Sequence, residues 1–178
     1  GTAVMVVVGD STACEYPEKE VRRGWGTYIQ AYFTDAVKVF NKARSGRSTK
    51  TFIEQGLWRE VLAMEPDYIL IQFGHNDSHA PENPESTDAD GDFREYLRQY
   101  IEQARAIDAV PVLVTPMYRR KFDDQGNIHD NLLPYAEAMK AVAAEKEVPL
   151  VDLNSASEKL YLQLGPDRVQ ELANAPDD

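Results

Sequence analysis

Five short runs of apolar, mostly β-branched residues recur along the chain and predict five buried β-strands. We place these strands at residues 4–8, 37–40, 68–73, 110–115 and 150–153. None of the runs alternates strictly between apolar and polar residues. That pattern is typical of strands that are covered on both faces, as in a parallel sheet.

Between these runs, apolar residues recur every three or four positions, as they do on one face of a helix. Gly56 separates two of the predicted helices, and Pro134 suits the first turn of another. Alternating strands and helices predict an α/β fold with right-handed crossovers, and we expect the doubly wound strand order 2-1-3-4-5. The predicted helical segments are residues 25–33, 52–53, 58–62, 93–104 and 135–143.

Composition narrows the class of protein. The chain has 178 residues, a formal net charge of −11 and one cysteine, Cys14. This length suits one domain, and a single cysteine allows no intrachain disulfide. The negative charge disfavours nucleic acid and anionic membranes as partners. No apolar run approaches the ~20 residues of a membrane span, and the oligomeric state cannot be deduced from the sequence.

Small and polar residues follow the first three predicted strands directly. The first strand ends in GDS at 9–11, the second precedes NKARSGRST at 41–49, and the third ends in FGHND at 73–77. The carboxyl ends of parallel strands meet at one edge of the sheet, where ligands bind in this architecture. Two polar loops, 76–92 and 118–131, are expected at the same edge.

An acyl-transfer site needs a nucleophilic oxygen and hydrogen-bond donors directed at the developing oxyanion. Ser11 can supply the oxygen and its own backbone N–H. The Gly46 N–H is a second candidate donor, since a glycine lets the backbone approach a ligand closely. The Asn76 side-chain amide is a third.

At these positions the chain resembles the GDSL/SGNH hydrolases and, more narrowly, the rhamnogalacturonan acetylesterases among them. GDST, ARSGRS and GHND are similar to the family's first three blocks and occur in the same order. GWG at 24–26 and LIQFGHND at 70–77 strengthen the narrower resemblance, which extends from residue 4 to about residue 165. It implies a serine esterase on a flavodoxin-like three-layer α/β/α sandwich with a five-stranded parallel sheet, and no metal or organic cofactor.

The resemblance implies Ser11 as the nucleophile, with Gly46 and Asn76 completing the oxyanion hole. The family's last block is Asp-x-x-His, and none of the three histidines of this chain has aspartate three residues before it. Because the sequence ends in ANAPDD, we expect Asp178, or else Asp177, to begin that block. We therefore expect one SGNH-hydrolase domain over 1–178 without its C-terminal segment; loss of the base is the alternative.

Other residues near these motifs have structural as well as functional interpretations. We expect Asp10 to organise the turn before Ser11. His75 is a candidate general base. Its neighbour Asn76 must point at the site, however, and adjacent side chains in this turn should diverge, so we expect His75 to pack or to bond a loop. His79 and His129 lie on the polar loops and are expected to be solvated. A metal site at His79 and Asp77, or at DADGD (88–92), and a nucleophilic role for Cys14 are disfavoured.

Basic and aromatic residues suggest possible substrate contacts. We expect Arg44 and Arg47 to pair with local carboxylates rather than bind a uronate. Arg119 and Arg120 follow the fourth strand and would give the edge a basic character that suits an acidic polysaccharide. Tyr118 is a candidate sugar contact, whereas Trp25 and Trp58 are expected in the core.

The sequence and the resemblance together predict a serine esterase that hydrolyses acetyl esters on a pectin-, rhamnogalacturonan- or xylan-type carbohydrate through an acetyl-serine intermediate. Three alternatives remain. The first is a catalytically impaired carbohydrate-binding relative, and the second is a lipase or thioesterase of the same family. The third is a flavodoxin-like module in which GDSTA binds a phosphate at a helix N-terminus. Action on polysaccharide favours export, and uptake of oligosaccharides would allow a cytoplasmic enzyme.

Overall fold

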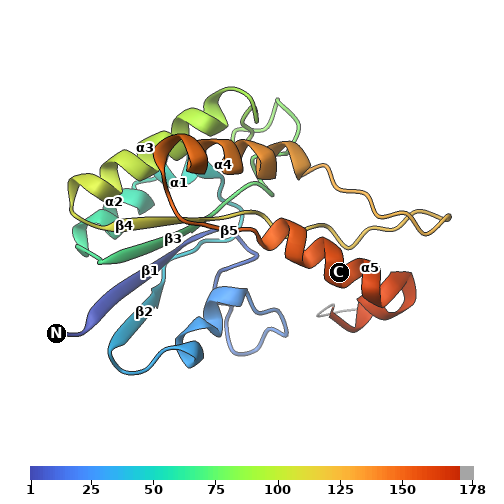
Figure 1. Ribbon diagram of the computed structural model, residues 1–178, viewed down its shortest axis with the longest axis horizontal. Coiled ribbons are helices and arrows are strands. Elements are labelled where there is room, and N and C mark those ends of the chain that lie inside the picture. The colour runs from blue at the N-terminus through green and yellow to red at the C-terminus, as the bar shows by residue number, and fades with distance from the viewer. Residues whose placement is uncertain (173–178) are drawn as a thin grey trace.

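A computed structural model describes residues 1–172, which form a five-stranded sheet in the order β2-β1-β3-β4-β5 (Figure 1). All four strand pairings are parallel, so the predicted order and direction are confirmed. The strands are β1 (Ala3–Gly9), β2 (Val37–Asn41), β3 (Tyr68–Gln72), β4 (Val110–Val114) and β5 (Leu150–Val151).

Within residues 1–172, five α-helices and three short 3₁₀ helices pack around the sheet. Helices α1 to α4 lie together on one side of the sheet, and α5 extends from its carboxyl edge on the other side (Figure 1). The α-helices are α1 (Thr49–Glu54), α2 (Leu57–Ala63), α3 (Asp92–Ala106), α4 (Leu133–Lys146) and α5 (Leu153–Arg168). The 3₁₀ helices are η1 (Trp25–Thr27), η2 (Ile29–Tyr32) and η3 (Val169–Leu172).

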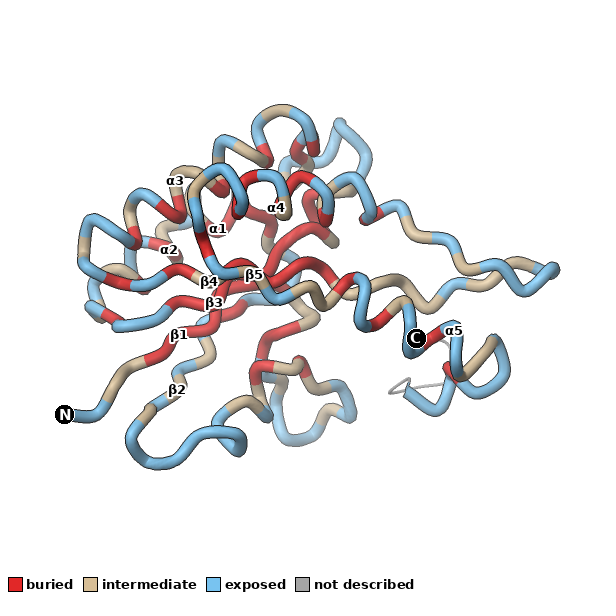
Figure 2. Tube along the Cα trace, in the orientation of Figure 1, coloured by how far each residue is buried: buried red, intermediate tan, exposed pale blue. Residues whose placement is uncertain are grey.

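The larger core lies between the sheet and α1–α4, where the inward faces of these helices are buried (Figure 2). Phe73 and Tyr100 pack with their ring centroids 5.6 Å apart, and the Trp58 ring meets the Tyr100 ring edge-on at 4.7 Å. Trp58 is only 2% exposed, which confirms its predicted place in the core. The aromatic and aliphatic side chains of this layer hold α1, α2 and α3 on the sheet.

A smaller cluster covers the other face of the sheet, and there the prediction of an α-helix over 25–33 is wrong. The segment forms η1 and η2 because its backbone donors bind the turn after β1. The N–H groups of Gly24 and Gly26 donate to the carbonyls of Cys14 (3.0 Å) and Ala13 (3.1 Å). A Cβ on Gly24 would lie 2.2 Å from the Ala13 carbonyl carbon, so only glycine fits.

The two end strands also differ from prediction. β2 is an edge strand, and every second residue of it is exposed, so it is not covered on both faces. β5 has two residues rather than four, because the Asp152 side chain accepts a hydrogen bond from the Ser155 N–H (3.1 Å) and caps α5. α5 was not among the helices predicted from the sequence.

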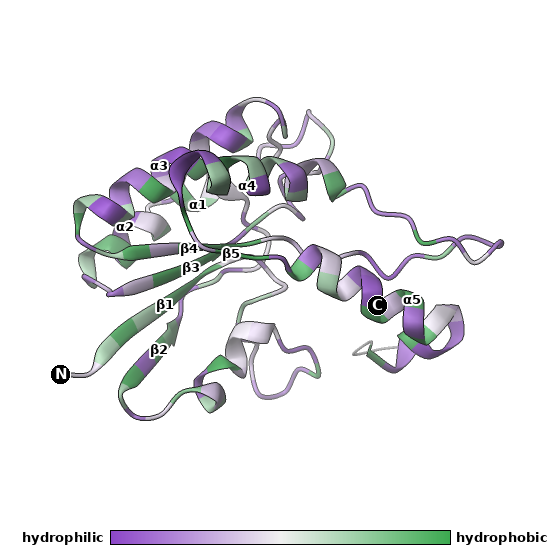
Figure 3. Ribbon diagram, viewed as in Figure 1, coloured by the Kyte–Doolittle hydropathy of each residue, from purple (hydrophilic) through white to green (hydrophobic). Residues whose placement is uncertain are grey.

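The carboxyl edge of the sheet carries both predicted polar loops. The second loop, residues 118–131, extends beyond the sheet beside α5. This loop and α5 are both more hydrophilic than the strands (Figure 3). One antiparallel bridge, between Phe122 and Ile128, closes this loop into a hairpin. Among residues 1–172, no helix combines the length and apolar character needed to cross a bilayer.

Candidate active site

The turn after β1 is held by the buried side chain of Asp10. Its Oδ1 accepts hydrogen bonds from the Thr12 N–H (2.9 Å) and the Thr12 hydroxyl (2.7 Å). The Asp10 carbonyl accepts the N–H groups of Ala13 (3.2 Å) and Cys14 (3.0 Å). These bonds fix the backbone around Ser11, and Asp10 has the organising role expected from the sequence.

The Gln72 side chain connects this turn to the rest of the sheet edge. Its Oε1 accepts from the Trp25 indole N–H (2.6 Å) and lies 2.9 Å from the Thr12 hydroxyl oxygen, and its Nε2 donates to the Thr115 carbonyl (3.0 Å). A Cβ on Gly9 would lie 2.7 Å from the Gln72 carbonyl oxygen. Glycine at position 9 therefore lets β1 and β3 approach closely just before the turn.

The loop that contains Gly46 is anchored to β1 and to the end of β3. The Arg44 N–H donates to the Gly9 carbonyl (2.9 Å), and the Asn76 amide donates to the Arg47 carbonyl (2.8 Å). Gly46 has φ = +78°, which favours glycine. Within residues 1–172, neither the Ser11 N–H nor the Gly46 N–H donates to a protein acceptor, so both are available to a ligand.

Asp77 attaches the end of β3 to the start of α1. Its carboxyl group is fully buried and accepts the N–H (3.2 and 3.3 Å) and the hydroxyl (2.5 Å) of Thr49, together with the Thr87 hydroxyl (2.8 Å). Burial raises the pKa of this carboxyl to about 7, against the opposing effect of these hydrogen bonds. Asn76 and Asp77 thus hold the Gly46 loop and α1 from one short segment.

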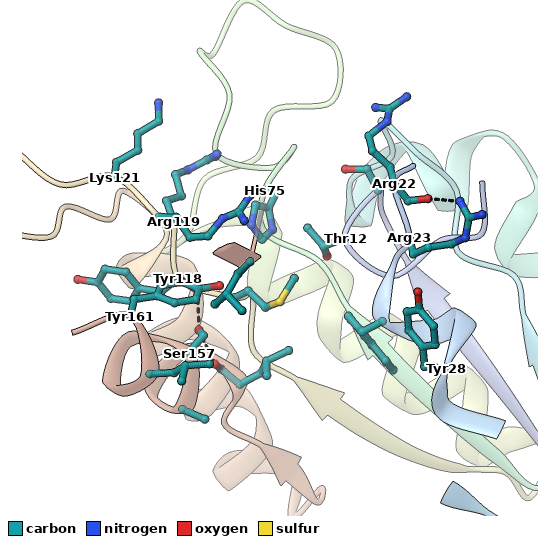
Figure 4. Close-up of a pocket in the computed structure, with 18 of the residues that line it drawn as sticks. Thr12, Arg22, Arg23, Tyr28, His75, Tyr118, Arg119, Lys121, Ser157 and Tyr161 are labelled. Carbon is teal, nitrogen blue, oxygen red and sulfur yellow. Dashed lines mark hydrogen bonds between the residues drawn. The ribbon is translucent and has the colours of Figure 1, made fainter. Parts of the chain in front are cut away.

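A cavity of about 720 Å³ lies beside Ser11, between residues 12–28 and the segment 117–121 with α5 (Figure 4). In the close-up, Tyr118 and Tyr161 line one wall and Tyr28 the other. Five cationic side chains line it, and the lining within residues 1–172 contains no aspartate or glutamate. The cationic residues are Arg22, Arg23, Arg119, Arg120 and Lys121.

The cationic side chains differ in how they are held. Arg22 pairs with Glu20 (2.6 Å) and lies over the Tyr16 ring, whereas Arg119 donates to the Asn131 side chain (2.8 Å). Arg119, Arg120 and Lys121 form no ion pair with any carboxylate of residues 1–172. The wall formed by 119–121 therefore presents to the cavity three cationic side chains that form no ion pair within residues 1–172.

The structure joins some of the predicted site residues and separates others. Ser11 lines the cavity. Gly46 and Asn76 do not line it; their loops are joined to one another by the Asn76–Arg47 hydrogen bond. Asp178 lies outside the described residues. Burial raises the pKa of the Cys14 thiol, which keeps it in the less nucleophilic protonated form.

The histidines divide into one at the cavity and two away from it. His75 lines the cavity with only 16% of its side chain exposed, which agrees with the expected packing, but among residues 1–172 its side chain forms no hydrogen bond to a loop. His79 and His129 are exposed and pair with Glu85 (2.6 Å) and Asp123 (2.8 Å).

Several expectations for neighbouring residues also changed. Arg44 and Arg47 pair with no carboxylate of residues 1–172, and Arg47 instead donates to the Gln55 side chain (2.9 Å). Trp25 lines the cavity instead of lying wholly in the core, and Tyr118 lines it as proposed. The lining residues of α5 were not predicted from the sequence, although they recur every three to four positions, as residues on one face of a helix do. These are Leu153, Ala156, Ser157, Leu160 and Tyr161.

Comparison with known proteins gives consistent matches. Residues 7–173 match the model of the GDSL-like Lipase/Acylhydrolase family. Rhamnogalacturonan acetylesterase RhgT of Bacillus subtilis (strain 168) is 38% identical over 169 residues, which cover 93% of this chain and 71% of RhgT. Probable rhamnogalacturonan acetylesterase YesY of the same strain is 34% identical over 165 residues, covering 92% of this chain and 76% of YesY.

Solved structures agree on the fold. The crystal structure of Bacillus subtilis YxiM superimposes with a TM-score of 0.83 at 29% identity; the match covers 97% of this chain but 49% of that one, so this chain spans about half the YxiM structure. Axe2, an acetylxylan esterase from Geobacillus stearothermophilus, gives a TM-score of 0.70 at 23% identity over 90% of this chain and 81% of Axe2.

Proposed function

We propose that this chain, which belongs to the GDSL-like lipase/acylhydrolase family, removes acetyl groups from a uronate-containing polysaccharide or oligosaccharide of the rhamnogalacturonan type. Family membership and the acetylesterase relatives make it a carboxylic ester hydrolase of the carbohydrate acetylesterase kind. We propose three further points: the sugar is acidic, the reaction passes through an acetyl-serine intermediate, and the residues named below have the roles given there.

In the proposed reaction, the Ser11 oxygen attacks the acetyl carbonyl carbon. The Ser11 proton passes to a general base, which the family resemblance assigns to the histidine of an Asp-x-x-His block. The resulting oxyanion accepts hydrogen bonds from the Ser11 N–H, the Gly46 N–H and the Asn76 amide, each worth about 2.7–4 kcal/mol of barrier. The protonated base gives its proton to the sugar oxygen as the carbon–oxygen bond breaks, which releases the sugar hydroxyl, and water then hydrolyses the acetyl ester on Ser11 to acetate.

The sugar assignment rests on one observation: the cavity beside Ser11 is lined by five cationic side chains and by no carboxylate of residues 1–172. A random selection of lining residues would not give this, since the chain carries 30 acidic and 19 basic residues. Arginine binds planar carboxylates such as those of uronates through two parallel hydrogen bonds. A neutral xylan backbone would leave this positive charge unused.

An acetylated xylan is the second candidate, because Axe2 shares the fold over most of its length. To separate the two, acetate release by the full-length protein is measured on acetylated rhamnogalacturonan and acetylated xylan oligosaccharides. We expect the larger kcat/KM on the uronate-containing substrate and none with Ser11→Ala. A larger value on xylan would favour the second candidate. Absence of both acetate release and organophosphate labelling of Ser11 would contradict an esterase.

A pair of variants tests the charge argument directly. Lys121→Gln removes one unpaired cation from the cavity wall and should raise KM for the uronate-containing substrate more than for the xylan. Lys159→Gln is the matched control, because Lys159 lies on the exposed part of α5 and does not line the cavity. Equal effects of the two variants would show that the cavity charge does not select the substrate.

A further inference from the structure

Two enclosed side-chain atoms beside the Ser11 turn face each other without a hydrogen-bond partner. They are Asp10 Oδ2 and His75 Nδ1, which lie 3.8 Å apart. Among residues 1–172, the only other buried side-chain nitrogen or oxygen without a hydrogen-bond partner is Thr27 Oγ1. A separation of 3.8 Å is too long for a hydrogen bond. Because an unpaired buried polar atom is destabilising, a small rotation of the ring or a bridging water is expected to connect the pair.

This contact selects one tautomer of the His75 ring. With the proton on Nε2, the Nδ1 lone pair would face the lone pairs of the Asp10 carboxylate. With the proton on Nδ1, an N–H group is directed at Oδ2, which is the favourable arrangement. The neutral ring therefore carries its proton on Nδ1 and its lone pair on Nε2.

The surroundings of His75 favour a neutral ring. Burial is the largest influence and lowers the pKa of His75. Arg119 and His79 act in the same direction, whereas Asp10 and Asp130 oppose it. The ring is consequently neutral at neutral and alkaline pH, where Nε2 is an acceptor.

The lone pair on Nε2 is accessible from the cavity. His75 lines the cavity, between Arg119 and Thr12 in the close-up (Figure 4). Its Nδ1 is enclosed, whereas Nε2 has no protein partner and is not among the enclosed atoms of residues 1–172. The other side-chain nitrogens of the lining belong to arginine, lysine and tryptophan and can only donate. His75 therefore supplies the nitrogen acceptor in a cavity rich in donors.

We propose that His75, oriented by Asp10, accepts a hydrogen bond from a sugar hydroxyl close to the acetyl ester. This role rests on the proposed function. It follows from position, because His75 lies between the end of β3 and Asn76 and lines the same cavity as Ser11. Sugar hydroxyls can donate as well as accept, so a cavity that offers both kinds of partner can fix the sugar's orientation.

Binding to the full-length Ser11→Ala protein tests the contact without turnover. Addition of His75→Phe should raise the Kd for an acetylated rhamnogalacturonan oligosaccharide about 3- to 10-fold, the effect of one net hydrogen bond. His75→Gln should restore most of the affinity, because its amide oxygen can accept. His79→Phe is the matched control and should not change the Kd, since His79 is exposed, pairs with Glu85 and does not line the cavity.

Kinetics distinguish a sugar contact from a role in the Ser11 chemistry. In the full-length protein, His75→Phe should lower the ratio of kcat/KM for the oligosaccharide to that for 4-nitrophenyl acetate about 3- to 10-fold. Loss on both substrates in equal proportion would leave the ratio unchanged and overturn the proposal, since His75 would then act on Ser11. An unchanged Kd would overturn it as well.

The tautomer can be measured without any substrate. Nitrogen-15 NMR of the imidazole should find the proton on Nδ1. In Asp10→Asn the amide oxygen is needed by the Thr12 N–H, so the amide nitrogen would face His75 and move the proton to Nε2. A wild-type proton on Nε2 would overturn the inference and leave the proposed esterase function standing. A proton on Nδ1 in a full-length protein that releases no acetate would instead contradict the proposed esterase function.

Discussion

Replacing Asp77 with asparagine should remove a pH dependence from the free energy of unfolding. The Asp77 carboxyl is fully buried at the junction of β3 and α1, and burial raises its pKa from 3.8 to about 7. Between these two values the folded chain keeps a proton that the unfolded chain has released. The protonated group therefore contributes stability that is complete below pH 3.8 and is lost as the pH rises through about 7.

The magnitude follows from the size of that shift. Each pKa unit corresponds to about 1.36 kcal/mol, so a rise from 3.8 to about 7 amounts to about 4 kcal/mol. Asparagine resembles the protonated acid, since its oxygen can accept from the Thr49 and Thr87 hydroxyls. Its amide nitrogen meets the Thr49 N–H, which destabilises the variant by a constant amount that does not depend on pH.

The assay is urea unfolding of both proteins at a series of pH values, followed by tryptophan fluorescence. Subtracting the two free energies cancels the titration of all other groups. The stability of the wild type relative to Asp77→Asn should fall by about 4 kcal/mol between about pH 4 and pH 8. Asp90→Asn is the control, because Asp90 is an exposed loop residue not far from Asp77 in sequence. Its unfolding free energy should change with pH as that of the wild type does.

A difference that stays constant with pH would refute the reasoning. So would a difference that grows as the pH rises, because the hydroxyl and N–H donors of Thr49 and Thr87 would then stabilise the carboxylate more than burial destabilises it. Either result would mean that Asp77 is ionised in the folded chain throughout the neutral range.

Three further predictions address the site and the core. Asn76→Ala should lower kcat about 100-fold or more by removing an oxyanion donor, and a near-normal rate in a steady-state assay would exclude it from that role. Gly46→Ala should destabilise the chain by about 1 kcal/mol or more, measured by urea unfolding, because alanine is strained at φ = +78°. Trp58→Ala should cost about 3–5 kcal/mol by emptying the space beside Tyr100, and a loss below 1 kcal/mol would mean that the core closes around the gap.

The fold could be predicted largely from local patterns. Buried parallel strands are continuous apolar runs, and α1–α4 show helical periodicity, so both kinds of element are visible in the sequence. The segment 25–33 has the same periodicity but forms 3₁₀ helices, because the N–H groups of 24–26 donate to the turn at 12–14. This long-range pairing has no signature in a sequence window.

The candidate site was predictable where function lies at the ends of strands. Ser11 lies two residues after β1 and Asn76 four residues after β3, so the strand assignment alone places them at one edge. The cavity walls were harder to predict, because residues 16–28, 117–121 and α5 meet only in the folded chain. The expectation that Asn76 points at the site and His75 away from it did not anticipate that His75 lines the cavity and Asn76 does not.

The contrast between an acidic molecule and a basic cavity affects how a charged substrate arrives. A polyanion far from the protein experiences the net charge of −11 and is repelled, whereas the charged side chains that line the cavity within residues 1–172 are all cationic. Salt screens charges over about 30 Å at 0.01 M and about 8 Å at 0.15 M, so it weakens the distant repulsion before it weakens contacts of a few ångströms. The association rate constant for an oligouronate should therefore rise with ionic strength at first and fall only at higher salt, whereas ordinary electrostatic steering falls throughout.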